Sequence, residues 1–320
     1  MNILLNTYCN LKCSYCFASD TMTHCKDDNM SCENFDYILN FLKNNNITTV
    51  KLLGGEPTLH PNFNYFLSKV VNEKFFREMI LFSNLTFDDN ILETILLVGS
   101  TMHLHILPNW NIENISENNY NRMLYNLDKI CTTNPNIIEA LGVNLHNPAM
   151  DISPIIELVK KYKLGLRWAI SAPNKTIEST FNLETYGRSF YPLLKHLFSE
   201  CIENKIYNYN DCNTIPPCVF TDEQFRDLLT MQPDSIIKKN VCKPVIDVQP
   251  NLDVIRCFGV SDIYKTNLKI FNKYNDLYDT LVENCNSISD SILFDKCKSC
   301  NIYKKNKKSC GCLAYRKNTL

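Results

Sequence analysis

The chain has 320 residues, 45% of them hydrophobic, which is enough to bury the core of one large domain, alone or with a small one. A formal net charge of −1 is unlike the strongly basic balance of proteins that bind DNA or RNA, so we expect no nucleic-acid partner. The first residues contain no basic segment followed by a long apolar run, and no apolar run is long enough to span a membrane. We therefore expect a cytoplasmic protein with no membrane partner.

Residues 2 to about 200 alternate between short apolar segments and amphipathic segments. Strands are expected at Ile3–Leu5, Val50–Leu53, Met79–Phe82, Met102–Leu107, Ala140–Leu145 and Leu164–Ile170, and helices near 32–45, 62–73, 88–97, 117–131, 151–162 and 184–203. Six repeats of strand then helix predict an α/β fold, a partial (βα)6 barrel. Ligands of such folds bind at the carboxyl ends of the strands.

The regular pattern ends near residue 205. Residues 206–320 are rich in cysteine, Asn, Asp and Pro and show little periodicity, which predicts a small second domain stabilised by metal ligation, after a first domain over residues 1–205. Within it, apolar alternation on both sides of Pro250-Asn251 predicts a β-hairpin. Because the chain opens directly on the first strand, we expect no separate N-terminal peptide-binding domain.

Three cysteines, Cys9, Cys13 and Cys16, follow the first expected strand with three and then two residues between them. With no export signal, clustered cysteines favour metal ligands over disulfides. Three thiolates on one loop can bind three irons of a [4Fe–4S] cluster and leave the fourth iron open to a small molecule. The alternative interpretations are part of a zinc site and three unrelated thiols.

The second expected strand is followed by Gly54-Gly55-Glu56-Pro57. The glycines permit close backbone approach to a ligand, and the Glu56 carboxylate can accept hydrogen bonds from an ammonium group. Taken alone, the segment also fits a glycine-rich turn before a helix, with Pro57 in its first turn.

Together these two motifs resemble the radical S-adenosylmethionine (SAM) superfamily. The resemblance implies that the amino and carboxylate groups of SAM chelate the open iron and that an electron cleaves SAM to a 5′-deoxyadenosyl radical, which abstracts hydrogen from a substrate. It also implies that Gly54 to Pro57 bind the methionyl amino group. Relatives often carry a Thr-Asn-Gly-like turn after the third strand; here Ser83 and Asn84 are candidate SAM contacts, and Leu85 replaces the glycine.

Strand alternation predicts polar side chains on one face of each later strand. His103 and His105 share a face of the fourth strand, Asn144 and His146 of the fifth, and Arg167, Ala169 and Ser171 of the sixth. A cavity for a zwitterionic cofactor and a substrate needs such groups, so we include Asn144 and Arg167 among the cofactor-binding candidates.

The cysteines after residue 205 resemble the SPASM or shorter twitch extensions of radical SAM enzymes. The candidate ligands are Cys212, Cys218, Cys242, Cys257, Cys297, Cys300, Cys310 and Cys312. The resemblance implies one or two auxiliary [4Fe–4S] clusters; two full clusters would require Cys212 or Cys218, since no cysteine follows Cys312. Asn251 stands where the hairpin glycine is expected. A zinc knuckle on the last four cysteines is the alternative. Other thiols, which we expect to be incidental, are Cys25, Cys32, Cys131, Cys201 and Cys285.

By resemblance, the chain is expected to be an oxidoreductase that modifies a ribosomally made peptide by oxidation or by thioether or carbon–carbon crosslinking. Flavodoxin or ferredoxin would supply the electron. A radical SAM dehydrogenase acting on a sugar or cyclitol, and a zinc-stabilised binding protein without enzymatic activity, are the alternatives. No residue is identified as the catalytic acid or base.

Overall fold

A computed structural model describes residues 1–16, 18–19, 22, 28–110, 115–172, 182–213, 215–232, 242, 245–291, 295–301, 304 and 311–314. Contacts divide the chain into two compact units. Unit 1 comprises Met1–Ser14, Ala18–Glu139 and Pro244–Glu283, and unit 2 comprises Tyr15–Phe17, Ala140–Lys243 and Asn284–Leu320. This division is not the one expected at residue 205. Of the residues after 205, Pro244–Glu283 belong to unit 1, and the others belong to unit 2.

Unit 1 contains a sheet with the strand order β10-β9-β8-β1-β2-β3-β4. The strands are β1 (Asn2–Leu4), β2 (Thr49–Leu53), β3 (Glu78–Ser83), β4 (His103–Trp110), β8 (Asp247–Val248), β9 (Asp253–Ile255) and β10 (Lys265–Asn267). Strands β8, β1, β2, β3 and β4 run parallel, and β8, β9 and β10 pair antiparallel. Parallel neighbours require crossover connections, which helices provide.

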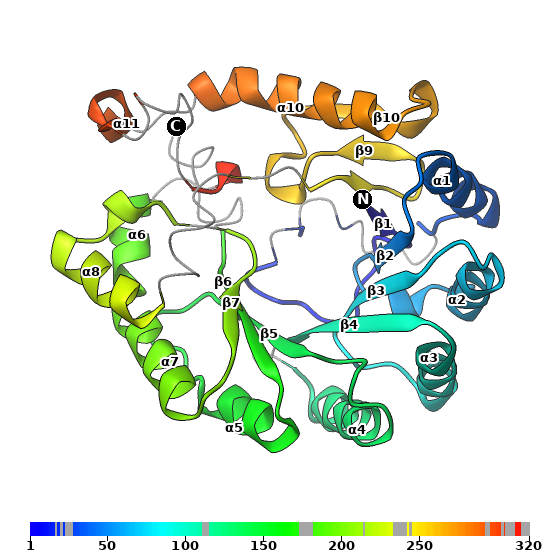
Figure 1. Ribbon diagram of the computed structural model, residues 1–320, viewed down its shortest axis with the longest axis horizontal. Coiled ribbons are helices and arrows are strands. Elements are labelled where there is room, and N and C mark those ends of the chain that lie inside the picture. Colours follow the sequence, from blue (N-terminus) through cyan, green and yellow to red (C-terminus); the bar gives the residue numbers. More distant parts are fainter. Residues whose placement is uncertain are drawn as a thin grey trace. The chain divides into compact units, whose positions relative to one another are not determined.

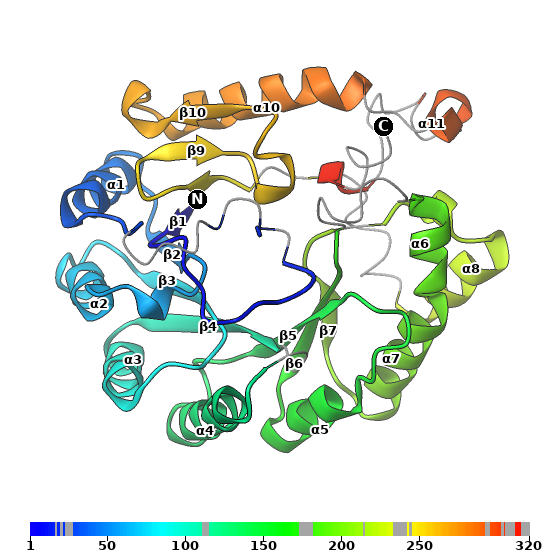
Figure 2. The same ribbon diagram turned by 180° about the vertical axis from the view of Figure 1, so that it is seen from behind.

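The helices between the parallel strands of unit 1 are α1 (Cys32–Asn44), α2 (Phe63–Asn72), α3 (Asp89–Thr101) and α4 (Glu117–Thr133). They lie along one side of β1 to β4 (Figure 1 and Figure 2). Ser31, Asp88 and Ser116 cap α1, α3 and α4 by accepting a hydrogen bond from the backbone three residues on. Alternate strand residues such as Leu52 and Leu81 are fully buried, and their neighbours are half-exposed, so one face of the sheet is the apolar one.

The expected hairpin around Pro250-Asn251 is confirmed as β8 and β9. Strand β8 also pairs in parallel with β1, so the hairpin extends the sheet of unit 1. The buried Asp247 carboxylate on β8 accepts a hydrogen bond of 2.7 Å from the Asn2 side chain, and burial raises the pKa of Asp247 to about 7.

Unit 2 contains three parallel strands, β5 (Ala140–Leu145), β6 (Gly165–Ile170) and β7 (Asn208–Asn210). Its helices are α5 (Ser153–Tyr162), α6 (Leu183–Ser189), α7 (Tyr191–Glu203), α8 (Asp222–Met231) and α11 (Asp295–Ser299). Helix α10 (Tyr274–Ser291) begins in unit 1 and ends in unit 2. Strand β6 is buried along its whole length, as expected for a parallel strand covered on both faces.

The predicted α/β class with parallel strands is confirmed, and three local predictions differ from the structure. The single helix expected over 184–203 is two helices that meet at Phe190, because Pro192 has no backbone N–H and cannot continue a helix across this point. The region beyond residue 205 is also more regular than expected, since it contains β7, α8 and α10. Strand β4 extends to Trp110 instead of ending at Leu107.

No helix in the described part of the chain is both long enough and apolar enough to cross a membrane.

The chain leaves β3 through a tight turn at Leu85. Leu85 has a φ of 60°, in the left-handed region that favours glycine, and its side chain is fully buried. Its N–H donates to the Ser83 hydroxyl at 3.1 Å, and its carbonyl accepts from Asn126 of α4 at 2.8 Å. A left-handed backbone conformation, which glycine adopts most easily, is therefore present here with a leucine, held by hydrogen bonds and by burial of its side chain.

We expect Leu85→Ala to be less stable than Leu85→Gly, the reverse of the usual order. Both variants lose the buried side chain, but only alanine retains the left-handed strain of about 1–2 kcal/mol. Denaturant unfolding of both variants measures the difference. An alanine variant more stable than the glycine variant would show that the turn relaxes out of the left-handed region.

Candidate cofactor site at the carboxyl edge of unit 1

The segment that leads into the cysteine loop pairs with the end of β2. Leu5 N–H donates to the Leu53 carbonyl at 2.7 Å, Gly55 N–H to the Asn6 carbonyl at 3.1 Å, and Glu56 N–H to the Tyr8 carbonyl at 2.8 Å. The two sequence motifs are thus joined by backbone hydrogen bonds just before Cys9.

Both glycines of the second motif are required by this pairing. A Cβ on Gly54 would collide with Asn6, and a Cβ on Gly55 would collide with the backbone of Tyr8 and Cys9. Backbone atoms cannot move aside as a flexible side chain can, so any larger residue at position 55 would displace the start of the cysteine loop. The sequence predicted that these glycines allow close approach to a ligand. In the structure the groups that lie close to them are Asn6, Tyr8 and Cys9 of the same chain.

Glu56 connects three elements through one buried carboxylate. Its Oε1 accepts from the Thr58 hydroxyl at 2.6 Å, the Ser83 hydroxyl at 2.8 Å and Thr58 N–H at 3.3 Å. Its Oε2 accepts from Asn84 N–H at 2.7 Å. The side chain is 1% exposed, so these donors replace water around it. Pro57 follows in the short 3₁₀ helix Pro57–Leu59.

Two opposing effects act on the pKa of Glu56. Burial raises the pKa, and the hydrogen bonds from Thr58, Asn84 and Ser83 lower it, with burial the larger effect. Because the native pKa is raised above the ordinary value, protonation of this group favours the folded state, and its contribution to stability falls as pH rises through the interval between the two pKa values.

Asn84 links the end of β3 to the cysteine loop. Its side-chain N–H donates to Asn10 Oδ1 at 2.9 Å, and its Oδ1 accepts from the Thr86 hydroxyl at 2.6 Å. The Asn10 amide in turn donates to the Thr86 hydroxyl at 2.8 Å. Asn10 lies between Cys9 and Cys13, so this triangle fixes the loop to the turn after β3. Asn10 and Thr86 were not predicted from the sequence as site residues, although each is next to a residue that was.

The cysteine loop places a backbone N–H donor beside the sulfur of its first cysteine. Leu11 N–H points to Cys9 Sγ at 3.4 Å, and such hydrogen bonds to sulfur tune iron–sulfur clusters. Cys9 and Cys13 belong to unit 1 and are half-buried. Cys16 belongs to unit 2, where Tyr15 beside it stacks on His146 with ring centroids 4.5 Å apart. The thiol chemistry and the hydrogen bond fit a [4Fe–4S] cluster held by this loop.

Two further candidates for cofactor binding lie in unit 2. Arg167 on β6 is buried and pairs with Asp211 at 2.5 Å between Nη1 and Oδ2. Asn144 on β5 is half-buried, and its carbonyl lies 3.0 Å from Nδ1 of His146. Their role in binding SAM stays a prediction. Asp211 was not identified from sequence, since a lone carboxylate in a polar segment carries no distinctive pattern. His146 was placed with Asn144 on the polar face of the fifth strand but was not assigned to the cofactor.

The fourth strand shows the predicted alternation, since Leu104 and Ile106 are buried and His105 is half-exposed on the other face. The histidines, however, occupy the start of β4, beside Glu78 at the start of β3, whereas Ser83 ends β3. Parallel strands place these at opposite edges of the sheet, so the histidines lie away from the predicted SAM contacts.

The C-terminal cysteines are distributed over both units. Cys257 lies in unit 1, and the other predicted auxiliary ligands lie in unit 2. Of these, Cys212 and Cys218 are exposed, Cys242 and Cys300 are half-buried, and Cys297 and Cys312 are buried; Cys310 lies outside the described residues.

Cys312 packs beside the segment that carries two of these cysteines. Its Sγ lies 3.7 Å from Asn213 Oδ1, and it shares a small apolar cluster with Val219. Asn213 follows Cys212, and Val219 follows Cys218. The last cysteine of the chain is thus brought close to the Cys212–Cys218 segment.

Comparison with known proteins supports this picture. Residues 3–127 match the family model of the Radical SAM superfamily. No curated protein matches the chain.

Solved structures match over nearly the whole chain. The crystal structure of Streptococcus suis SuiB bound to S-adenosylmethionine is 16% identical, with 95% of this chain and 70% of that chain covered and a TM-score of 0.63. Native anSMEcpe with bound AdoMet and Kp18Cys peptide is 15% identical, with 100% and 94% covered and a TM-score of 0.66. SuiB bound to precursor peptide SuiA is 15% identical, with 98% and 69% covered and a TM-score of 0.62. At this identity the likeness concerns the fold. Residues 3–127 therefore form a radical SAM domain, and the chain has the radical SAM fold.

Proposed function

We propose that this protein is a radical SAM enzyme that oxidatively modifies a ribosomally made peptide in the cytoplasm. The observation that carries the proposal is the hydrogen-bonded connection between the cysteine loop and the Gly54–Pro57 segment. Backbone bonds from Gly55 and Glu56, and the side-chain triangle of Asn10, Asn84 and Thr86, join a three-thiolate loop to a glycine-rich strand end. A cluster and the SAM that chelates it need these two segments at a fixed spacing.

In this proposal Cys9, Cys13 and Cys16 bind the cluster, and the Gly54–Pro57 segment with Ser83 and Asn84 binds SAM. When bound, these groups supply the 5′-deoxyadenosyl radical that abstracts hydrogen, and flavodoxin or ferredoxin supplies the electron. The residues of the chain hold the cysteine loop and the SAM-binding segment in position. Glu56 fixes the turn at Ser83 and Asn84, and the two glycines keep the loop against β2.

The C-terminal cysteines bind one or two auxiliary [4Fe–4S] clusters in this proposal. Support comes from Cys312, which packs beside the segment containing Cys212 and Cys218. That proximity matches the expectation that these two residues complete the ligand sets of the last cysteines.

A peptide substrate is supported by the solved structures with the same fold, since SuiB was crystallised with precursor peptide SuiA and anSMEcpe with a Kp18Cys peptide. Oxidation or crosslinking of a peptide removes hydrogen from it. The peptide thereby undergoes a net two-electron oxidation, in which an auxiliary cluster is suited to accept the electron of the substrate radical.

We expect replacement of Cys9, Cys13 or Cys16 by alanine to abolish SAM cleavage. Each variant should contain about four fewer irons per chain, because the first cluster loses a ligand. The measurements are iron, sulfide and zinc content after anaerobic purification, and 5′-deoxyadenosine formation with SAM and dithionite.

Cys201→Ala is the matched control. This α7 thiol is buried, which raises its pKa to about 12, and it is not among the predicted cluster ligands, so its loss should leave iron content and SAM cleavage unchanged. Zinc in stoichiometric amount without sulfide in the unmutated protein would instead establish a zinc-stabilised protein and refute the proposal.

We expect Glu56→Gln to weaken SAM binding by about 10- to 100-fold while the first cluster still assembles. The amide retains one acceptor but turns an N–H₂ group toward Asn84 N–H or toward the hydroxyls that Oε1 now accepts from, so the turn beside the proposed SAM site is displaced. Equilibrium binding of SAM and the iron content of the same samples measure the two effects separately. Glu93→Gln, an exposed residue of α3, is the control. Unaltered SAM affinity in Glu56→Gln would exclude this residue from the site.

We expect the enzyme to convert a peptide encoded beside its gene to a product lighter by two hydrogen atoms. Mass spectrometry after incubation with SAM and reductant measures this, with the Cys9→Ala variant as the inactive control. Conversion of a free sugar or cyclitol, with the peptide unchanged, would replace the peptide assignment by that of a small-molecule dehydrogenase.

A further inference from the structure

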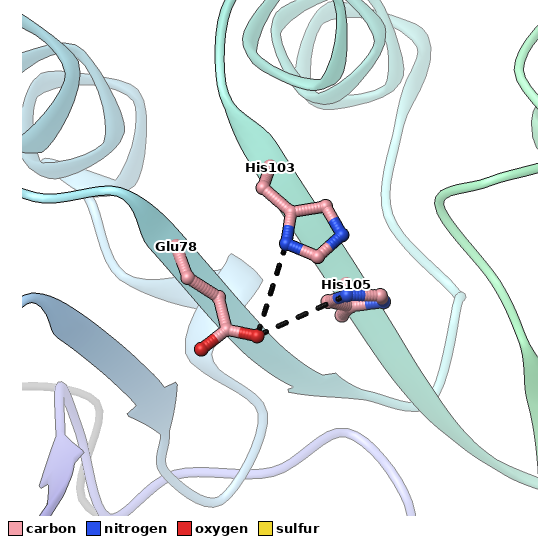
Figure 3. A group of neighbouring side chains, drawn as sticks. All are labelled: Glu78, His103 and His105. Carbon is pink, nitrogen blue, oxygen red and sulfur yellow. Dashed lines mark ion pairs between the residues drawn. The ribbon is translucent and has the colours of Figure 1, made fainter.

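Two histidines and a glutamate meet at the amino edge of the unit 1 sheet. Glu78 opens β3 and His103 opens β4, directly opposite each other in the strand register, and His105 follows two residues later on the same face. Figure 3 shows the three side chains projecting together from the two strands. The apolar face of β4, with Leu104 and Ile106, lies on the other side. Strand pairing therefore holds three potential ligands at one place.

The ligand atoms surround a common point. Glu78 Oε1 lies 3.9 Å from His103 Nδ1 and 3.9 Å from His105 Nε2. One ligand atom from each of the three residues lies within 4.8 Å of the other two, and the imidazole rings meet edge to face with centroids 4.1 Å apart. A nitrogen–oxygen separation of 3.9 Å is too long for a hydrogen bond. Ligand atoms bound tetrahedrally to zinc lie roughly 3.4 Å apart, so small side-chain rotations would bring this set to metal-binding distance.

Neighbouring residues orient two of these ligands. The second oxygen of Glu78, Oε2, accepts a hydrogen bond of 2.8 Å from the Thr49 hydroxyl on β2, which leaves Oε1 directed at the histidines. The second nitrogen of His105, Nδ1, faces Glu139 Oε1 at 3.5 Å. A carboxylate on the far nitrogen of a ligating histidine is the usual outer partner that fixes its tautomer and orientation.

We propose that Glu78, His103 and His105 form a binding site for a divalent transition-metal ion of the Zn²⁺ type, with Glu139 as its outer carboxylate. Two imidazoles select zinc and similar ions over Mg²⁺ and Ca²⁺, which prefer oxygen ligands alone. The carboxylates of Glu78 and Glu139 balance the charge of a dication. His103 is 59% exposed, so the ion can enter from solvent and keep a water ligand.

The site is separate from the cofactor edge. Glu78 and Ser83 are the two ends of β3, which places them roughly 16 Å apart along the strand. The inference therefore holds whether or not the chain has radical SAM activity. The ion would tie the starts of β3 and β4 together, with β2 joined through Thr49.

Zinc titration of the anaerobically purified, cluster-containing full chain tests the proposal. We expect one zinc ion to bind with a first shell of nitrogen and oxygen at about 2.0–2.1 Å and no sulfur at about 2.3 Å in X-ray absorption spectra. Iron content should stay constant, which shows that zinc has not displaced a cluster. Glu78→Gln and His105→Ala should each weaken zinc affinity by at least about 10-fold, and Glu139→Gln by about 10-fold.

His196→Ala removes an exposed histidine from α7 and is the matched control, with zinc affinity unchanged. Circular dichroism of the variants before zinc is added establishes that each is folded. Glu78→Gln preserves side-chain size and serves if His105→Ala does not fold. A sulfur-only zinc shell, or zinc affinity equal to that of the unmutated protein in the folded ligand variants, would overturn the proposal.

Discussion

The carboxylate of Glu56 is the interaction on which the cofactor edge of unit 1 depends. Burying a charged group costs several kcal/mol unless hydrogen bonds replace its hydration, and here Thr58, Ser83 and Asn84 supply them. The same carboxylate therefore joins the end of β2 to the turn after β3. Removal of the carboxyl group would leave these buried donors without an acceptor, which costs about 1–3 kcal/mol for each group.

The cysteine loop is built onto this arrangement. Backbone pairing with Gly55 and Glu56 fixes the chain just before Cys9, and the side chain of Asn10 continues the connection to Asn84 and Thr86. The ends of β2 and β3 thus fix the position of the loop, and the glycines are needed because Asn6 and the backbone of Tyr8 and Cys9 approach them closely. A cluster ligated by such a loop would inherit the same fixed spacing to the SAM segment.

The two edges of the sheet carry different chemistry. Parallel strands place all their carboxyl ends on one side, where thiolates, glycines and a buried carboxylate form the proposed SAM site. The amino ends of β3 and β4 carry Glu78 and His105, whose geometry suits a metal ion. The proposed redox site thus lies after the ends of β1, β2 and β3, and the proposed structural metal site lies at the starts of β3 and β4, on the opposite edge of the same sheet.

The sequence alone determined the α/β class, the hairpin at Pro250-Asn251 and the two motifs, because apolar periodicity and the spacing of cysteines and glycines are local properties. It did not reveal β7, whose buried Asn208 and Asn210 have low strand propensity and are stabilised by hydrogen bonds with Trp168. Only the tertiary structure showed that Glu56 bonds to Ser83 and Asn84, and that Glu78 meets His105. These contacts join residues 27 or 28 apart in the chain, and they depend on strand register, which a sequence pattern does not specify.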